Sequence, residues 1–281
     1  MKHLDIWLIL MALAALAACG EGERERQPSA APSAASLHEA AEQRDADAAR
    51  ALLERGADPN ALLEEYRGTS LAELWGREMR ADGRVSRLLE VRPIHVAAVE
   101  GSAEVARLLL EAGADPAPKT RREYAPLHLA AWSDHADVVA VLLEAQPGPD
   151  LRTDRDLTPL HLAAFSDLDE MVRVLLEAGA QTGSTSRDGD TPLHYAAVGD
   201  APKAAKALIE AGAPLEARNA RDCTPLCSAV GRQKLASVVA LLEAGADPNA
   251  HPTGGRTLPA LAASYEQDEI VRALLRAGGQ W

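Results

Sequence analysis

The sequence is poor in aromatic residues and positive charge, and each shortage restricts what the protein can be. Aromatic side chains make up only 3% of its 281 residues, so Leu, Val and Ala must do most of the packing. The formal net charge is −13, which argues against binding to nucleic acid, because neutralising phosphates takes Lys and Arg. An acidic chain favours a basic partner.

Catalytic signatures are missing as well. The sequence contains no Gly-x-Ser-x-Gly, no His-Glu-x-x-His and no Gly-rich phosphate loop. His38 and Glu39 begin a string typical of zinc proteases, but Glu42 stands where the second His is required. We therefore expect a protein that is not an enzyme, with no catalytic residue and no cofactor.

What the sequence does have is a seven-residue frame that repeats every 33 positions. In its clearest copy, Thr191 suits a helix N-cap, Pro192 suits the first helical position, and Gly212 follows a second apolar helix. Copies of the frame, some of them altered, start at Arg92, Ala125, Thr158, Thr191, Thr224 and Thr257. Each copy predicts two short helices joined by a turn.

The period of 33, the Thr-Pro-Leu-His frame and the Gly-Ala-Asp-Pro loop at Gly245–Pro248 closely resemble the ankyrin repeat. This resemblance implies an all-α solenoid of stacked helix–turn–helix repeats with hairpin-like finger loops. The repeat domain then covers 35–281, with repeats at 35–61, 92–124, 125–157, 158–190, 191–223, 224–256 and 257–281. About 24 extra residues create an insertion at 62–91, for which a β-hairpin finger and a short extra helix pair both remain open.

Residues 1–18 resemble the signal peptide of a bacterial lipoprotein. Lys2 precedes an apolar run from Ile6 to Ala18, which is shorter than the roughly 20 residues that span a bilayer. The run ends in Leu-Ala-Ala-Cys, which resembles a lipobox and implies that Cys19 is lipidated; the alternative is an ordinary signal with an incidental Cys. Residues 19–34 have no large apolar side chain and predict a flexible tether.

The residue after Cys19 is Gly20 rather than Asp. By resemblance to lipoproteins of Gram-negative bacteria, this implies the outer membrane, with the protein facing the periplasm. A Gram-positive host would instead leave the protein on the outer face of its one membrane.

Histidine and cysteine are the candidates for metal binding. Five histidines share the third position of the first helix of a repeat: His38, His95, His128, His161 and His194. An imidazole at this position can bond to the cap residue and to the next repeat's loop, so we expect a structural role and no metal. Cys223 and Cys227 are four apart, which is not the spacing of a redox or zinc motif. We expect them to stay unbridged.

The expected binding surface lies on the concave side of the repeats. Two positions of the frame place Tyr124, Trp132, Leu157 and Phe165 there, and large aromatic side chains are enriched at interface hot spots. The alternative is that the aromatic rings belong to the core. The finger arginines Arg121, Arg122, Arg155 and Arg187 would form a charged rim.

These patterns together predict a lipid-anchored ankyrin-repeat scaffold of the bacterial cell envelope that binds another protein and is itself a monomer. The membrane would be a partner only through the lipid on Cys19. The alternative is an immunity or inhibitor protein that neutralises a toxic envelope enzyme by binding it.

Overall fold

The computed structural model describes residues 36–66, 88–145, 148–250 and 255–281. The expected signal peptide, Cys19 and the expected tether therefore lie outside the described residues. No helix within those ranges is long and apolar enough to cross a membrane.

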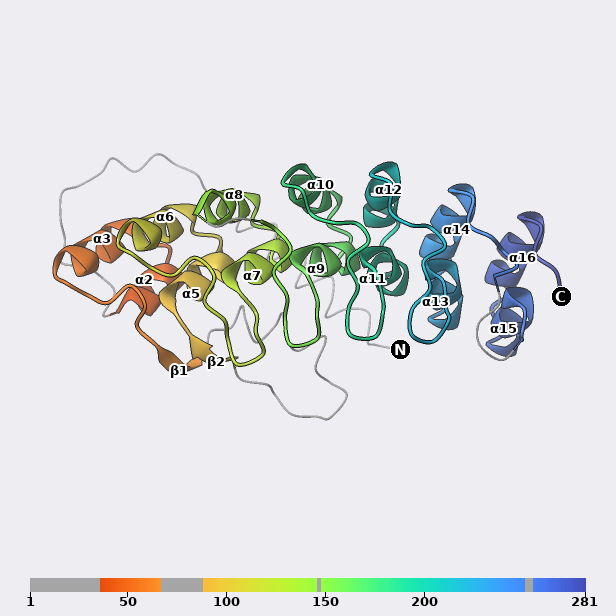
Figure 1. Ribbon diagram of the computed structural model, residues 1–281, viewed down its shortest axis with the longest axis horizontal. Helices are drawn as coiled ribbons and strands as arrows, with labels where there is room; N and C mark the ends of the chain where they lie inside the picture. Colours follow the sequence, from red (N-terminus) through yellow and green to blue (C-terminus); the bar gives the residue numbers. More distant parts are fainter. Residues whose placement is uncertain (1–35, 67–87, 146–147, 251–254) are drawn as a thin grey trace, which may run out of the picture. The chain divides into compact units, whose positions relative to one another are not determined.

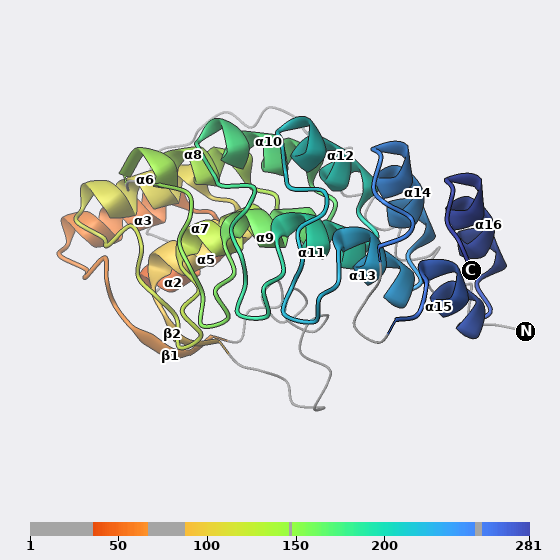
Figure 2. The same cartoon turned by 45° about the vertical axis from the view of Figure 1, so that its right-hand side comes forward.

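The described chain is a row of antiparallel helix pairs (Figure 1), so the expected helical solenoid is confirmed. The first helices of the pairs are α2 (Leu37–Glu42), α5 (Pro93–Glu100), α7 (Pro126–Trp132), α9 (Pro159–Phe165), α11 (Pro192–Gly199), α13 (Pro225–Gly231) and α15 (Leu258–Ser264). The second helices are α3 (Ala46–Glu54), α6 (Ala103–Glu111), α8 (Ala136–Ala145), α10 (Asp169–Glu177), α12 (Pro202–Glu210), α14 (Leu235–Glu243) and α16 (Asp268–Arg276). First helices form one layer and second helices the other, and the finger loops extend beyond the first layer (Figure 2).

The repeated frame explains why neighbouring first helices lie so close. In α9, Leu160, Ala163 and Ala164 have no exposed surface. The Ala pair leaves one face of the helix thin, so the next first helix can approach, while the Leu fills the space between the two layers. Because every repeat carries this pattern, one apolar core continues from α2 to α16.

The helix caps depend on the residue at the third helical position. The hydroxyl of Thr224 accepts the backbone N–H of Cys227 at 3.2 Å, as expected of an N-cap. Where the third residue is His, the imidazole contacts the cap residue. The hydroxyl of Thr191 lies 2.9 Å from Nδ1 of His194, and the backbone N–H of Thr191 donates to the same nitrogen at 3.1 Å. Thr191 is the N-cap of α11, as expected, and the imidazole of His194 accepts the N–H of this cap residue.

The two ends of the insertion form a β-ribbon. β1 (Leu63–Tyr66) pairs antiparallel with β2 (Leu88–Val91), with Leu63 opposite Val91, and residues 67–87 lie outside the described part. Nε2 of His38 lies 3.2 Å from the carbonyl oxygen of Val91. Histidines of later repeats make the same contact with fingers, so the ribbon occupies the place of the first finger.

Candidate functional site

The fingers of the middle repeats end in turns of one design. In the finger at 153–157, the backbone N–H of Thr153 donates to the carbonyl of Leu157, and the N–H of Leu157 donates to the Thr153 hydroxyl, both at 3.1 Å. Asp156 takes a left-handed conformation (φ 59°), which lets the chain reverse. The same pair of contacts closes the fingers at 120–124, 186–190 and 219–223.

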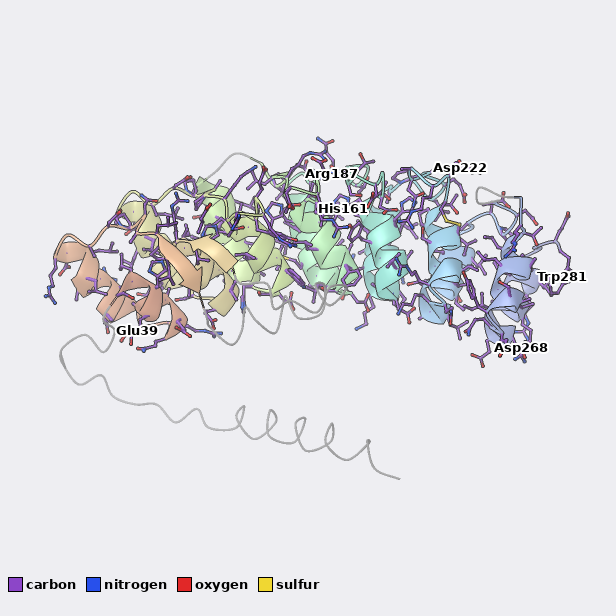
Figure 3. The ribbon with its side chains drawn as sticks, turned by 90° about the horizontal axis from the view of Figure 1, so that it is seen from below. Glu39, His161, Arg187, Asp222, Asp268 and Trp281 are labelled. Atoms are coloured by element: carbon purple, nitrogen blue, oxygen red, sulfur yellow. A yellow bond between two sulfur atoms is a disulfide. The ribbon has the colours of Figure 1, made fainter. Side chains whose placement is uncertain are left out.

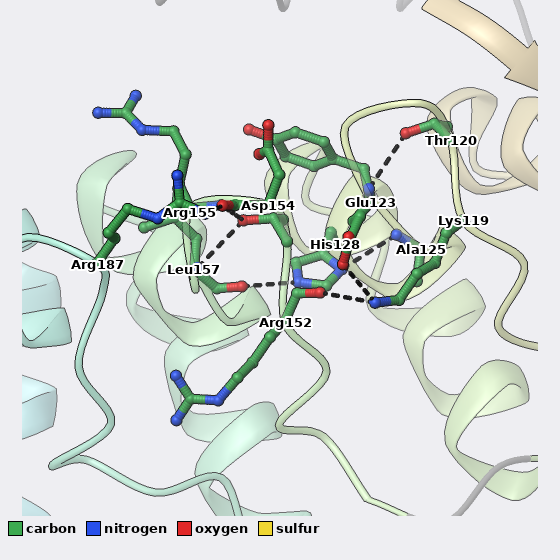
Figure 4. A network of polar contacts seen from close by, with 12 residues as sticks. Lys119, Thr120, Glu123, Ala125, His128, Arg152, Asp154, Arg155, Leu157 and Arg187 are labelled. Atoms are coloured by element: carbon green, nitrogen blue, oxygen red, sulfur yellow. Dashed lines mark hydrogen bonds and ion pairs between the residues drawn. The ribbon is translucent and has the colours of Figure 1, made fainter.

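Each finger is tied to the next. The backbone N–H of Asp154 donates to the carbonyl of Arg122 at 3.2 Å, and the N–H of Arg187 donates to the carbonyl of Arg155 at 2.9 Å. Figure 4 shows this edge from close by, and Figure 3 shows Arg187 and Asp222 on the same side of the row. These bonds order the fingers into a continuous edge, which keeps the side chains of Arg122 and Arg187 exposed.

The histidines tie the fingers to the first helices. Nε2 of His128 lies 3.0 Å from the carbonyl oxygen of Leu157 in the next finger (Figure 4). The equivalent distances are 3.1 Å for His161, to Asp190, and 2.9 Å for His194, to Cys223, whereas Nε2 of His95 lies 3.0 Å from the carbonyl oxygen of Pro118, just before its finger. Since Nδ1 accepts the cap N–H in these repeats, Nε2 carries the hydrogen and donates it to the finger. The expected structural role of the imidazoles is thereby confirmed.

Burial keeps these imidazoles neutral. Loss of solvation of the charged form lowers the pKa of His95, His128 and His161 to about 4, although the carbonyl that each ring contacts opposes the shift. Desolvation also lowers the pKa of His194 and of His38. Among the described residues, no three His, Cys, Asp or Glu side chains converge as metal ligands would.

The expected aromatic patch is only partly present. Tyr124 and Leu157 are 3% and 1% exposed, so placing them on an accessible surface is wrong. Both side chains belong to the finger edge that folds back on the first helices, and the ring of Tyr124 meets His128 edge-on at 5.9 Å. Trp132 is half-buried and packs against the core. Phe165 is half-buried as well.

Phe165 belongs instead to a cavity of about 930 Å³ on the finger side of α9, α11, α13 and α15. Its apolar lining includes Phe165, Tyr195, Val198 and Leu261, each of them half-buried. The ring of Tyr195 stands edge-on to Phe165 at 6.4 Å. Of the residues expected at the binding face, Phe165 and the finger arginine Arg155 line this cavity.

Small side chains in the sixth repeat create the hollow. Ser228 stands where the preceding repeat has Tyr195, and Gly231 stands where that repeat has Val198. Both residues line the cavity, and a Cβ added at Gly231 would meet no atom within 4 Å. These two small residues are visible in the sequence, but a binding face predicted from large aromatic residues does not include them.

Charged side chains surround this apolar floor. Arginines come from three fingers and from the end of α13: Arg155, Arg221, Arg256 and Arg232, all exposed. Two acidic residues, Asp188 and Asp190, also line the cavity. A carboxylate oxygen of Asp190 accepts the side-chain amide of Asn219 at 2.6 Å. The charged groups of the cavity are thus net positive, in a chain whose net charge is −13.

A disulfide closes one wall of the cavity. Cys223, at the end of its finger, is bonded to Cys227 on α13, with 5.4 Å between their Cα atoms. The expectation of two unbridged thiols is therefore wrong. Cys227 occupies the position of the frame's His, so a covalent bond joins the finger that ends one repeat to the first helix of the next repeat.

Comparisons with known proteins agree with this architecture. A sequence model described as ankyrin repeats (3 copies) matches residues 81–153 and 127–219, and one for a single ankyrin repeat matches residues 36–62, together more than half of the chain. The crystal structure of the ankyrin repeat domain of Bcl-3, described as a unique member of the IkappaB protein family, is similar. Its TM-score is 0.64 and its sequence identity 25%, over 88% of this chain and 100% of that one. No curated protein matches the sequence.

Proposed function

Since this chain belongs to the ankyrin-repeat proteins, we propose that it binds one partner protein on the side of its fingers and first helices. Ankyrin repeats generally mediate protein–protein interaction, and stacked repeats offer extended concave surfaces for it. The cavity at α9–α15 carries the proposal, because a hollow with an apolar floor and a few polar groups is typical of binding sites. The protein acts as a monomeric scaffold without catalysis of its own.

A photo-crosslinking experiment tests where the partner sits. A photoreactive phenylalanine analogue replaces Ser228, which lines the cavity, or Lys206, which is exposed on the second helix α12. In cells that make the full chain, light should produce a covalent adduct with one other protein from the Ser228 position only. Adducts from Lys206 and none from Ser228 would move the binding face to the other layer.

The proposal includes a location. A lipid on Cys19 would hold the protein on a membrane of the bacterial envelope, with the outer membrane facing the periplasm as the favoured site. The Cys223–Cys227 disulfide supports a compartment outside the cytoplasm, because structural disulfides persist where the environment is oxidising.

The change Cys19→Ser tests the anchor. It should release the protein from membranes into the soluble fraction, because lasting attachment needs more than one acyl chain and the variant would carry none. Membrane fractionation followed by detection of the protein measures the effect. Ser36→Ala, in the described part of the chain, is the control and should stay with the membrane. A Cys19→Ser protein that still sediments with membranes would contradict the lipid anchor.

A further inference from the structure

We propose that the cavity between α9 and α15 binds an acidic segment of a partner protein that also carries apolar side chains. This inference rests on the proposed function and specifies its partner. It reverses the expectation drawn from composition, because an acidic chain as a whole favours a basic partner. Whether an acidic or a basic partner is preferred depends on the charges at the cavity and on the distance over which other charges act.

Three of the four arginines at the cavity have no acidic partner among the described residues. Arg155, Arg232 and Arg256 form no ion pair with any other residue that the structure describes. On the second-helix layer, by contrast, Arg107 pairs with Glu144 and Arg173 pairs with Glu210, each at 3.4 Å. Guanidinium groups bind carboxylates through two parallel hydrogen bonds, so exposed arginines around a hollow match acidic side chains.

The negative charge of the second-helix layer acts too far away to cancel this match, and on the fingers Asp222 is paired with Arg218 at 2.9 Å. At physiological salt the screening length is about 8 Å, so carboxylates on the second-helix layer contribute little at the cavity. Within the cavity, one of the two aspartates, Asp190, is engaged by Asn219 at 2.6 Å. A bound acidic side chain therefore meets mainly the arginines.

The floor of the cavity adds the apolar part of the specificity. Phe165 and Tyr195 present half-buried rings, and Leu261 lies on α15, two repeats after Tyr195. Ser228 and Gly231 leave the space that an incoming side chain would fill. Burial of an apolar side chain there supplies affinity, while the arginines around it select the charge of the flanking residues.

Fluorescence anisotropy with the full chain and labelled synthetic peptides of equal length tests the proposal. One peptide alternates Glu with Leu and Phe, a second has Lys in place of Glu, and a third has Ser in place of Leu and Phe. The first should bind at least about tenfold more tightly than either of the others, and its affinity should fall as salt rises. Equal affinity for the Lys peptide, or no binding of the Glu peptide, would overturn the proposal.

Matched variants locate the binding. The double change Arg232→Glu and Arg256→Glu should weaken the Glu peptide roughly tenfold or more, because it turns attraction into repulsion at the cavity. The double change Arg107→Glu and Arg173→Glu alters net charge equally on the other layer and should shift affinity less than about twofold. Equal losses in both variants would place the site elsewhere.

A steric variant tests the same cavity without changing charge. In Gly231→Phe the new ring enters open space, so the fold should persist and peptide binding should be lost. Ser264→Phe, at the equivalent position of the next repeat and outside the cavity lining, is the control. If Gly231→Phe binds the Glu peptide normally, the proposal fails.

The experiments separate this inference from the proposed function. A crosslinked partner at Ser228 whose binding withstands high salt and the Arg232→Glu and Arg256→Glu changes would overturn the acidic specificity and keep the binding face. If the Ser228 position gives no adduct and the Glu peptide does not bind, both fail.

Discussion

The imidazole at the third position of a first helix joins three parts of the chain. In His161, Nδ1 accepts the cap N–H of Thr158 at 3.1 Å, while Nε2 donates to the finger carbonyl of Asp190 at 3.1 Å. One side chain thus satisfies backbone groups at the start and at the end of its repeat, which burial would otherwise leave unpaired. The neutral ring can do this, whereas a protonated ring would lose its acceptor nitrogen.

Acidification should therefore destabilise the fold. The pKa of His95, His128 and His161 is about 4 in the folded protein, below the ordinary value of 6.5, so the unfolded chain binds more protons between these values. Their stabilisation is complete above pH 6.5 and is lost as the pH falls toward 4. Each of these histidines should lower the free energy of unfolding by about 1 kcal/mol between pH 7 and pH 5.5. Urea unfolding followed by circular dichroism measures this loss.

The variant His161→Gln shows whether the imidazole is responsible. It should be less stable than wild type at pH 7, by roughly 1–3 kcal/mol, because the cap N–H of Thr158 loses its partner. It should also lose less stability than wild type between pH 7 and pH 5.5. The same pH dependence in both proteins would show that carboxylates, not this histidine, set the response.

At the scale of elements, the finger is the part that varies. It is an extended β-ribbon after α3, a short turn in the middle repeats, and covalently joined to α13 through Cys223 and Cys227. The finger at 219–223 keeps its contact with His194, and the disulfide joins it in addition to α13, the first helix that follows it. The geometry of the cavity wall is therefore fixed by a bond that reductants can break.

Reduction should loosen this wall at a modest cost in stability. The disulfide closes a short loop, with a sequence separation of 4, so chain entropy predicts a loss of about 2 kcal/mol. Urea unfolding with and without a thiol reductant measures the loss. The double variant Cys223→Ala and Cys227→Ala should not respond to reductant. Detection of either thiol in the unfolded, unreduced protein would contradict the bridge.

The elements were predictable to the extent that the frame recurs. The helix pairs and the role of the imidazoles follow from the 33-residue period, because each repeat restates the same caps and core positions. Tyr124 and Leu157 were misplaced because a finger packs its last residue inward as it returns to the helix. The cavity was not predicted because small residues, here Ser228 and Gly231, mark a hollow. The sequence criterion for a binding face was the presence of large aromatic residues, which does not detect a hollow.

At the scale of the whole molecule, stability should depend on place in the row. Each repeat packs only on its neighbours, so unfolding is governed by intrinsic repeat stability and the interfaces between adjacent repeats. Leu175 on α10 and Leu274 on α16 occupy equivalent positions, and neither side chain has exposed surface. Burial alone therefore predicts equal effects of truncating them.

The two leucines differ in the position of their repeats along the row. The pair α9–α10 has neighbours on both sides, because α9 packs on α7 and on α11, whereas the pair α15–α16 packs within the described chain on α13 and α14 only. Leu175→Ala should lower the main urea transition by roughly 2–5 kcal/mol, since a cavity in the middle weakens two interfaces. Leu274→Ala should instead let the last pair unfold by itself at low urea and leave the main transition nearly unchanged. Hydrogen exchange resolved by repeat distinguishes the cases, and equal shifts of one shared transition would mean that the row unfolds as a single cooperative unit.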